Sequence, residues 1–140
     1  MSTDRQCRLL RQAASTIQQN AGDIHGRPKN AFALRDLFAD DAVWTVPGDG
    51  IMAGTFRGRE QILRFLGRLP KQTGGTYGSR LIDVLASEER AAALYRASGE
   101  RRGRRLDLDQ VLLFLLRDGI ITEVLALPSD ASAFEEFWAP

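Results

Sequence analysis

The sequence predicts an α+β fold in which helices come first and a run of long antiparallel strands follows. Two observations lead to this prediction. Apolar residues recur at helical spacing in three segments of the first half, and the period then changes to that of strands. Short turn sequences separate the later strands, which is typical of an antiparallel meander. We therefore expect three N-terminal helices to cover one face of a curved, cone-shaped sheet and to leave a cavity at its open end.

Three segments of the first half are expected to be helices. The first spans Asp4 to Gln19 and carries its apolar residues along one broad stripe. The second spans Ala31 to Phe38 and ends at a pair of aspartates. The third begins at Gly58, and Pro70 to Gly78 follows it as a connection rich in helix breakers. Its apolar residues fall at helical spacing: Ile62, Leu63, Phe65, Leu66 and Leu69.

The sheet is expected to contain a strand from Ala42 to Val46, a short extended piece that reaches Phe56, and four longer strands. The longer strands are Tyr77 to Ala86, Arg90 to Gly99, Leu106 to Leu116 and Ile120 to Leu127. Asp118-Gly119 is a strong hairpin signal between the last two strands, because both residue types tolerate the positive φ of a tight turn. After Pro128, three aromatic residues at helical spacing predict a C-terminal helix: Phe134, Phe137 and Trp138.

Length and composition narrow the class of protein. With 140 residues, we expect one domain over residues 1–140. The net charge of +1 gives no broad basic surface, so we expect no nucleic-acid partner. No apolar run approaches the length of a membrane helix, no signal peptide is visible, and the single Cys7 fits a reducing compartment, so the expected location is the cytoplasm. Metal-ligand spacing, a phosphate loop and a nucleophile motif are missing from the sequence, so no cofactor is expected.

Several short segments, in their order, resemble the nuclear transport factor 2-like superfamily. The resemblance lies in its SnoaL-like polyketide cyclase and ketosteroid isomerase-like branch. The matching pieces are Leu37-Phe38-Ala39-Asp40-Asp41-Ala42-Val43-Trp44 with Pro47-Gly48, Gly54-Thr55-Phe56-Arg57-Gly58-Arg59-Glu60, Asp83-Val84-Leu85, Arg104-Arg105-Leu106-Asp107 and Arg117-Asp118-Gly119-Ile120-Ile121-Thr122-Glu123. The resemblance implies a cystatin-like α+β barrel, and it says less about chemistry because these motifs mainly form the fold.

The chain departs from this family at the positions where its enzymes carry acids and bases. By resemblance, the cyclases use a His near Leu112 and an Asp near Ala126, and the isomerases use a base near Val46. All three positions are apolar here and cannot transfer a proton. The Arg and Asp pattern of limonene-epoxide-hydrolase-like members is also incomplete, because Ser98 stands two residues after Arg96. The resemblance therefore implies a cavity more apolar than that of the acid–base members.

Strand alternation identifies the residues that would line this cavity. In the strand from Leu106 to Leu116, Gln110 shares a face with Leu112 and Phe114, and we expect this face to point inward. Gln110 is then the main polar anchor, and Glu123 is the best remaining carboxylate for a general acid, although its parity is opposite to that of its inward neighbours. The expected substrate-binding residues are Trp44, Val46, Tyr95, Leu112, Phe114, Val124 and Ala126. The competing interpretation is that these residues are simply packed core.

Three functions remain open from the sequence. The first is a cyclase or isomerase of a bulky apolar molecule, of polyketide type, that acts mainly by folding its substrate. The second is a ligand-binding protein without chemistry. The third is an epoxide hydrolase or ring-opening cyclase that uses Arg96 with Glu123, Asp107 or Asp109. The opposite face of the sheet is apolar as well. We therefore expect two chains to form a homodimer through Val111, Leu113 and Leu115 on this face.

Overall fold

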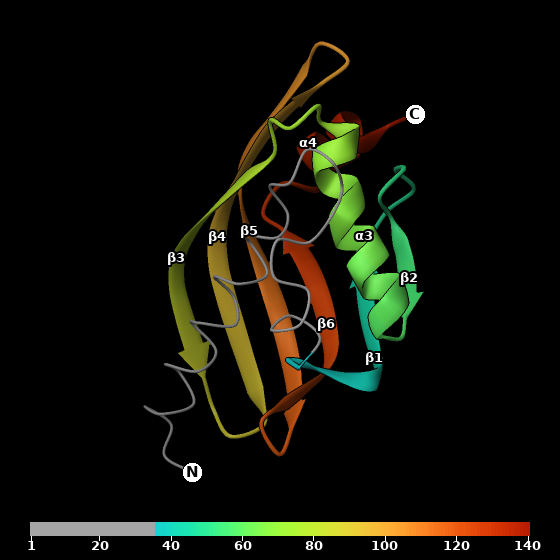
Figure 1. Cartoon of the computed structure of the whole chain (residues 1–140). Helices are drawn as coiled ribbons and strands as arrows, with labels where there is room; N and C mark the ends of the chain where they lie inside the picture. Colours follow the sequence, from blue (N-terminus) through green and yellow to red (C-terminus); the bar gives the residue numbers. More distant parts are fainter. Residues whose placement is uncertain (1–35) are drawn as a thin grey trace.

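The computed structural model describes residues 36–140 and confirms an α+β fold (Figure 1). Its elements are β1 (Phe38–Val46), β2 (Gly54–Arg57), α3 (Arg59–Gln72), β3 (Gly78–Ala86), β4 (Arg90–Arg101), β5 (Arg104–Arg117), β6 (Ile120–Pro128) and α4 (Ala131–Trp138). The strands form one six-stranded sheet in the order β2-β1-β6-β5-β4-β3. The sheet is curved and does not close (Figure 1). The expected helix from Asp4 to Gln19 lies outside the described residues.

The long strands β4, β5 and β6 are joined by two tight hairpins, as the turn sequences predicted. At the β5–β6 turn, Asp118 has φ 51° and Gly119 has φ 79°. At the β4–β5 turn, Arg102 has φ 51° and Gly103 has φ 75°. Positive φ at both central residues gives a turn whose twist matches that of the flanking strands. All neighbouring strands are antiparallel except β1 and β6, which run parallel.

The first described strand corrects one expectation about a helix. The second helix was expected to reach Phe38, but residues 36 and 37 form a turn and Phe38 begins β1. Phe38 pairs with Ile121 of β6, and the register then shifts before Val43 pairs with Glu123. Pairing with a strand far along the chain therefore overrides the local helical spacing. The rest of that expected helix, residues 31–35, lies outside the described part of the chain.

Helix α3 packs against β1 and β2 and extends further than expected (Figure 1). Its buried face carries Ile62, Phe65, Leu66 and Leu69, which confirms the apolar stripe. Pro70 does not end the helix, which continues to Gln72. Thr73 is the C-terminal cap of the helix. Its hydroxyl donates to the carbonyl oxygen of Leu69 at 2.8 Å. A proline in the last turn removes one amide donor but leaves little helix beyond it to disturb.

The C-terminal aromatic residues form a helix, as their spacing predicted. The side chain of Asp130 caps α4 by accepting from the amide of Ala133 at 3.0 Å. Phe134, Phe137 and Trp138 are buried. Neither of the two helices within residues 36–140 is long and apolar enough to cross a membrane.

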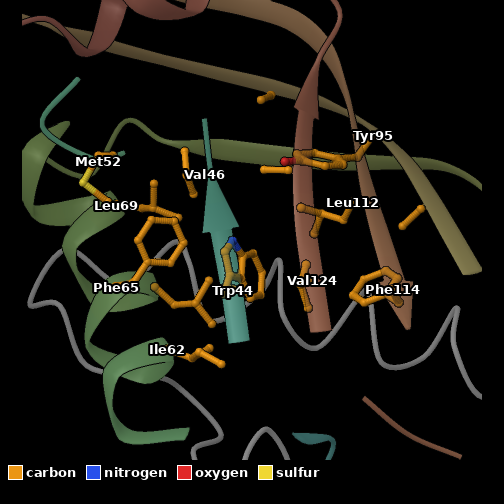
Figure 2. Packing of buried hydrophobic residues seen from close by; sticks show 14 of the residues in the cluster. Trp44, Val46, Met52, Ile62, Phe65, Leu69, Tyr95, Leu112, Phe114 and Val124 are labelled. Atoms are coloured by element: carbon orange, nitrogen blue, oxygen red, sulfur yellow. The ribbon is translucent and has the colours of Figure 1, made fainter. Parts of the chain in front are cut away.

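The sheet has one buried face and one exposed face. Along β5, the side chains of Gln110, Leu112, Phe114 and Leu116 are buried, whereas Val111, Leu113 and Leu115 are only partly covered. This alternation confirms the predicted parity of the strand. The buried face meets α3 in one continuous apolar core (Figure 2). A cavity lies within this core.

Candidate functional site

A hollow opens between the buried face of the sheet, α3 and α4. It contains about 560 Å³ of space free of protein atoms when its open mouth is included, and the centre of a water-sized molecule can occupy about 50 Å³ of it. A bulky ligand would therefore need the hollow to widen. Its lining residues are Trp44, Val46, Met52, Phe65, Leu66, Leu69, Tyr77, Ser79, Tyr95, Leu106, Gln110, Leu112, Ala126, Phe134 and Trp138.

Large side chains form the walls of the hollow. Trp44 of β1 contacts Phe65 of α3, with ring centroids 5.6 Å apart (Figure 2). Phe134 and Trp138 add aromatic surface from α4. On β6, the small Ala126 takes part in the same lining, next to Leu112 of β5. A small residue among large ones leaves space that a packed core would fill, so this part of the core is hollow.

A chain of hydrogen-bonded polar side chains crosses the otherwise apolar lining. The hydroxyl of Tyr95 donates to Oε1 of Gln110 at 2.6 Å, and both side chains are buried. The hydroxyl of Tyr77 hydrogen-bonds with those of Tyr95 and Ser79. Tyr95 and Gln110 lie opposite each other on β4 and β5, so the sheet register itself brings them together. The network therefore rests on rigid strands, which favours a fixed geometry.

The two tyrosines of this network have raised pKa values. Burial raises the pKa of Tyr95 well above its ordinary value, and its interaction with Tyr77 raises it further. Burial also raises the pKa of Tyr77, and its hydrogen bonds to Ser79 and Tyr95 offset part of that rise. Both hydroxyls consequently stay neutral around pH 7. The single hydroxyl proton of Tyr95 is already donated to Gln110, and both tyrosines are poorly suited to act as bases.

Six of the residues expected to contact a substrate line the hollow: Trp44, Val46, Tyr95, Gln110, Leu112 and Ala126. Phe114 and Val124 are fully buried in the core and do not line it. Glu123 is exposed on the other face of the sheet, where it is paired with Leu115 across the ladder. It cannot contact a molecule bound in the hollow. The carboxylate that was expected to act as a general acid therefore lies outside the candidate site.

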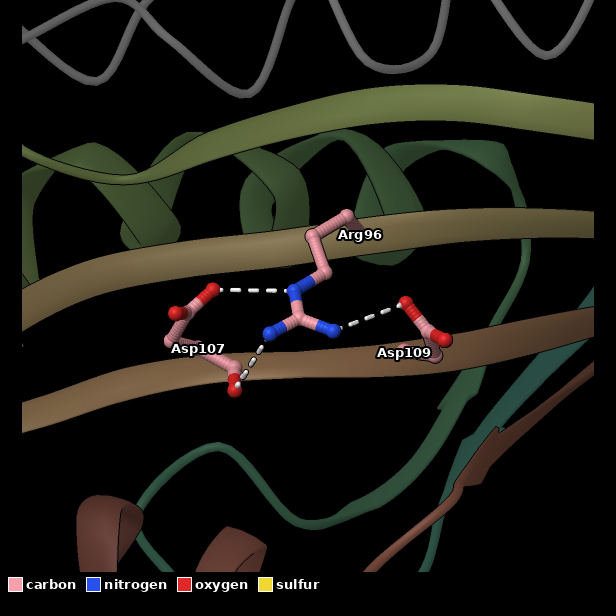
Figure 3. Close-up of polar contacts among 3 residues, drawn as sticks. All are labelled: Arg96, Asp107 and Asp109. Carbon is pink, nitrogen blue, oxygen red and sulfur yellow. Dashed lines mark hydrogen bonds and ion pairs between the residues drawn. The ribbon is translucent and has the colours of Figure 1, made fainter.

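Arg96 does meet both aspartates suggested for epoxide opening, but in another place. Its Nε donates to Asp107 at 2.9 Å and its Nη1 to Asp109 at 3.3 Å (Figure 3). The Arg96 side chain holds the pKa of Asp107 below its ordinary value through that hydrogen bond. Arg96 alternates with Tyr95 along β4, so the cluster lies on the face opposite the hollow. These groups therefore cannot act on a molecule in the hollow.

The residues that sequence reasoning did not place in the site come mainly from outside the central strands. Tyr77 and Ser79 stand at the start of β3, Met52 lies in the turn before β2, and Phe134 and Trp138 belong to α4. The helical spacing in the tail indicated that its aromatic residues are buried, but not where they pack. Among residues 36–140, no cluster of His, Cys, Asp and Glu side chains is arranged to hold a metal ion.

Comparison with known proteins identifies relatives over most of the chain. The model of the SnoaL-like domain matches residues 21–124. The uncharacterized protein Rv0034 of Mycobacterium tuberculosis is 35% identical over 124 residues, which cover 84% of this chain and 95% of the relative. The structure of Bal32a, from a soil-derived mobile gene cassette, is 31% identical with a TM-score of 0.82 and covers 97% of this chain and 98% of its own. A Xanthomonas campestris protein with a cystatin-like fold is 26% identical with a TM-score of 0.76, over 92% of this chain and 97% of its own.

Proposed function

The chain belongs to the SnoaL-like domain family, and from this premise we propose that it takes a mainly apolar small molecule into the hollow and converts it in an isomerase- or cyclase-type reaction. The observation that carries the proposal is the hollow itself, an apolar space with one buried polar contact between Tyr95 and Gln110. Apolar walls with a few fixed polar groups are the usual form of a small-molecule site. The proposed substrate is compact, because the free space is small.

The proposed catalytic contribution is orientation together with polarisation of a carbonyl. The amide N–H₂ of Gln110 would donate to the substrate oxygen, while Tyr95 holds the Gln110 oxygen and fixes the direction of the amide. A donor that itself accepts a hydrogen bond is polarised and becomes a stronger donor. Apolar walls would hold a flexible substrate in a reactive fold, which in favourable intramolecular reactions supplies up to ~7–11 kcal/mol.

The second candidate is a binding protein that carries out no reaction. It is favoured by the lining, because none of the described residues around the hollow is an Asp, Glu, His, Lys or Arg. Abstraction of a proton would need a base of this kind within hydrogen-bond reach, and the raised pKa of Tyr77 and of Tyr95 makes these lining tyrosines poor bases. A ring closure that moves no proton remains compatible with this lining, so the two candidates differ in one measurable property, turnover.

Binding can be tested with a neutral single-ring arylamine, chosen to match the small free space, whose fluorescence rises in apolar surroundings. We expect it to bind the wild-type protein and to be excluded by Ala126→Trp, which fills the hollow. Leu85→Trp is the matched control, because it adds the same side chain at a position that is 68% exposed and away from the hollow. Equal binding by the wild type and Ala126→Trp would overturn the proposed site.

Turnover can be tested with a neutral trienone that closes a ring by intramolecular cycloaddition. This step is an isomerisation, so it needs neither a proton donor nor a co-reactant. We expect the wild type to accelerate this ring closure and Ala126→Trp to abolish the acceleration. Gln110→Leu should reduce the acceleration by about five- to a hundredfold, because one hydrogen bond in the transition state is lost. Binding of the trienone without acceleration would favour the binding protein.

A further inference from the structure

The indole N–H of Trp44 is a buried donor without an acceptor among the described residues. Its side chain belongs to the core and is only 3% exposed, yet its Nε1 finds no hydrogen-bond partner within residues 36–140. Buried polar groups are nearly always paired, because an unpaired one loses its bond to water and gains nothing. Trp44 also lines the hollow. In Figure 2 its nitrogen lies on the side of the ring that faces Tyr95.

Gln110 supplies a second donor to the same hollow, and unlike the indole nitrogen of Trp44 it is not fully buried. Its Oε1 accepts from Tyr95, and its amide nitrogen donates to none of the described residues. The Gln110 residue as a whole is only 5% exposed and lines the hollow, so this nitrogen is reached mainly from the hollow. An amide nitrogen carries two N–H donors and no acceptor. The hollow therefore offers donors from two side chains, and its ligand must bring the acceptors.

The separation of these two donors, together with the uncharged lining around them, determines which ligand can accept hydrogen bonds from both. Trp44 stands on β1 and Gln110 on β5, with β6 between them in the sheet. Trp44 and Phe114 both lie opposite Val124 of β6, so Gln110 stands four residues further along β5. The two backbones are separated by two strand spacings, about 10 Å, across the sheet and by about 13 Å along it, so acceptors at two points of a ligand suit the donors better than a single atom. No described lining residue carries a charge at neutral pH, so a buried carboxylate would be left without a counter-ion.

We propose that the hollow selects a neutral, mainly apolar molecule with two carbonyl-type acceptors, one bound by Trp44 Nε1 and the other by the amide of Gln110. This specificity rests on the proposed function, because it names the ligand class of the same site. Trp44 is thereby assigned a role in recognition in addition to its packing against Phe65. A molecule without acceptors would fill the apolar space but leave both donors unpaired.

The test is a set of compact six-membered rings that differ in their acceptors: 1,4-cyclohexanedione, cyclohexanone, methylcyclohexane and cyclohexanecarboxylate. Binding is followed by NMR of the nitrogen-bound protons of the full chain, in which Trp44 and Trp138 give the two indole signals. We expect affinity to fall by roughly five- to tenfold for each acceptor removed. The dione should move the Trp44 indole proton downfield and shift the Gln110 amide signals, and the carboxylate should bind worst.

Variants separate the donor from the shape of the side chain. Trp44→Phe and Gln110→Leu should each bring the affinity for the dione down to that of cyclohexanone for the wild type, with little change for methylcyclohexane. Trp138→Phe is the matched control, because it shortens another tryptophan of the lining whose nitrogen is not a buried unpaired donor. It should retain the preference for the dione, and it identifies the indole signals.

The outcomes distinguish this proposal from the function on which it rests. If all four rings bind equally and the Trp44 indole signal does not move, the hollow is a ligand site but the donor assignment is wrong. If the carboxylate binds best, the ligand is an anion and the proposal of a neutral molecule falls. If the arylamine and all four rings leave every signal of the hollow unchanged, both proposals are wrong. The ring series uses the wild-type protein, so it remains decisive even where a variant fails to fold.

Discussion

At the scale of single residues, the contact between Tyr95 and Gln110 determines what the hollow can offer. Tyr95→Phe would remove the hydroxyl and leave Oε1 of Gln110 buried without its donor. An unpaired buried acceptor costs about 1–3 kcal/mol, so we expect urea unfolding to show a loss of that size in the free energy of unfolding. Tyr77→Phe is the control and should cost less, because Tyr77 is only partly buried. A fully stable Tyr95→Phe variant would mean that Gln110 finds another donor.

The raised pKa of Tyr95 also predicts how stability depends on pH. The unfolded chain releases the phenolic proton near pH 10, whereas burial makes the folded protein hold it to higher pH. The folded state then binds more protons than the unfolded state, so stability is full below about pH 10 and falls as the pH rises further. We expect this fall to be shallower in Tyr95→Phe, measured by urea unfolding between neutral and strongly alkaline pH. Parallel curves for the two proteins would contradict the assignment.

At the scale of elements, α4 is held over the hollow by two arginines of the β4–β5 hairpin. Arg101, itself buried, donates to the carbonyl oxygens of Phe137 at 3.2 Å and Ala139 at 2.8 Å, and Arg104 donates to the latter oxygen at 2.8 Å. Burial lowers the pKa of Arg101, and the neighbouring Arg102 and Arg104 lower it further. A cation at the C-terminal end of a helix also meets the negative end of the helix dipole. These contacts position the aromatic residues of α4 that line the hollow.

Arg101→Met should therefore weaken both the fold and the site. Losing charge-assisted hydrogen bonds to backbone oxygens is expected to cost about 1.5–3 kcal/mol in urea unfolding. Arylamine binding should weaken too, because Phe134 and Trp138 belong to the lining. Arg105→Met, which changes an exposed arginine of the same hairpin, is the control and should behave like the wild type. If both variants bind the arylamine normally, α4 does not depend on Arg101.

The elements differ in how far local sequence determines them. The hairpin at Asp118-Gly119 was predictable, because its residue types match its positive φ values. Phe38 was placed wrongly in a helix, since its pairing with Ile121 depends on a strand more than eighty positions away. Pro70 was placed in the connection after α3, although a proline in a last turn can be accommodated. Local rules fail here where a distant partner or the position within a helix decides.

At the scale of the whole molecule, the sequence predicted one wall of the hollow better than its other walls. Strand alternation put Gln110 and Leu112 on one face of β5, and the charged Arg117 on the other face indicated that theirs points inward. It also indicated that Glu123 faces away from its inward neighbours, as it does. The contributions of Tyr77, Met52 and α4 depend on how separate elements come together, which no local pattern specifies. The unpaired indole nitrogen of Trp44 likewise becomes visible only once its surroundings are known.

The exposed face of the sheet leads to the last prediction, a homodimer. Partly or fully exposed apolar side chains continue across the neighbouring strands β4, β5 and β6: Leu94, Val111, Leu113, Leu115, Leu125 and Leu127. The paired Arg96, Asp107 and Asp109 border them. A contiguous apolar patch of this kind is typical of an interface, and a self-complementary patch on a twofold axis is the commonest way to cover it.

We expect light scattering at micromolar concentration to give the mass of two chains and Leu113→Asp to give the mass of one. An aspartate at the centre of a dry interface would lose its hydration without gaining a partner. Arg64→Asp, at an exposed position of α3 on the other side of the sheet, is the control and should stay dimeric. Circular dichroism of Leu113→Asp should remain that of a folded chain, because Leu113 points away from the core. A wild-type protein that is uniformly monomeric at this concentration would show that the face remains open to solvent.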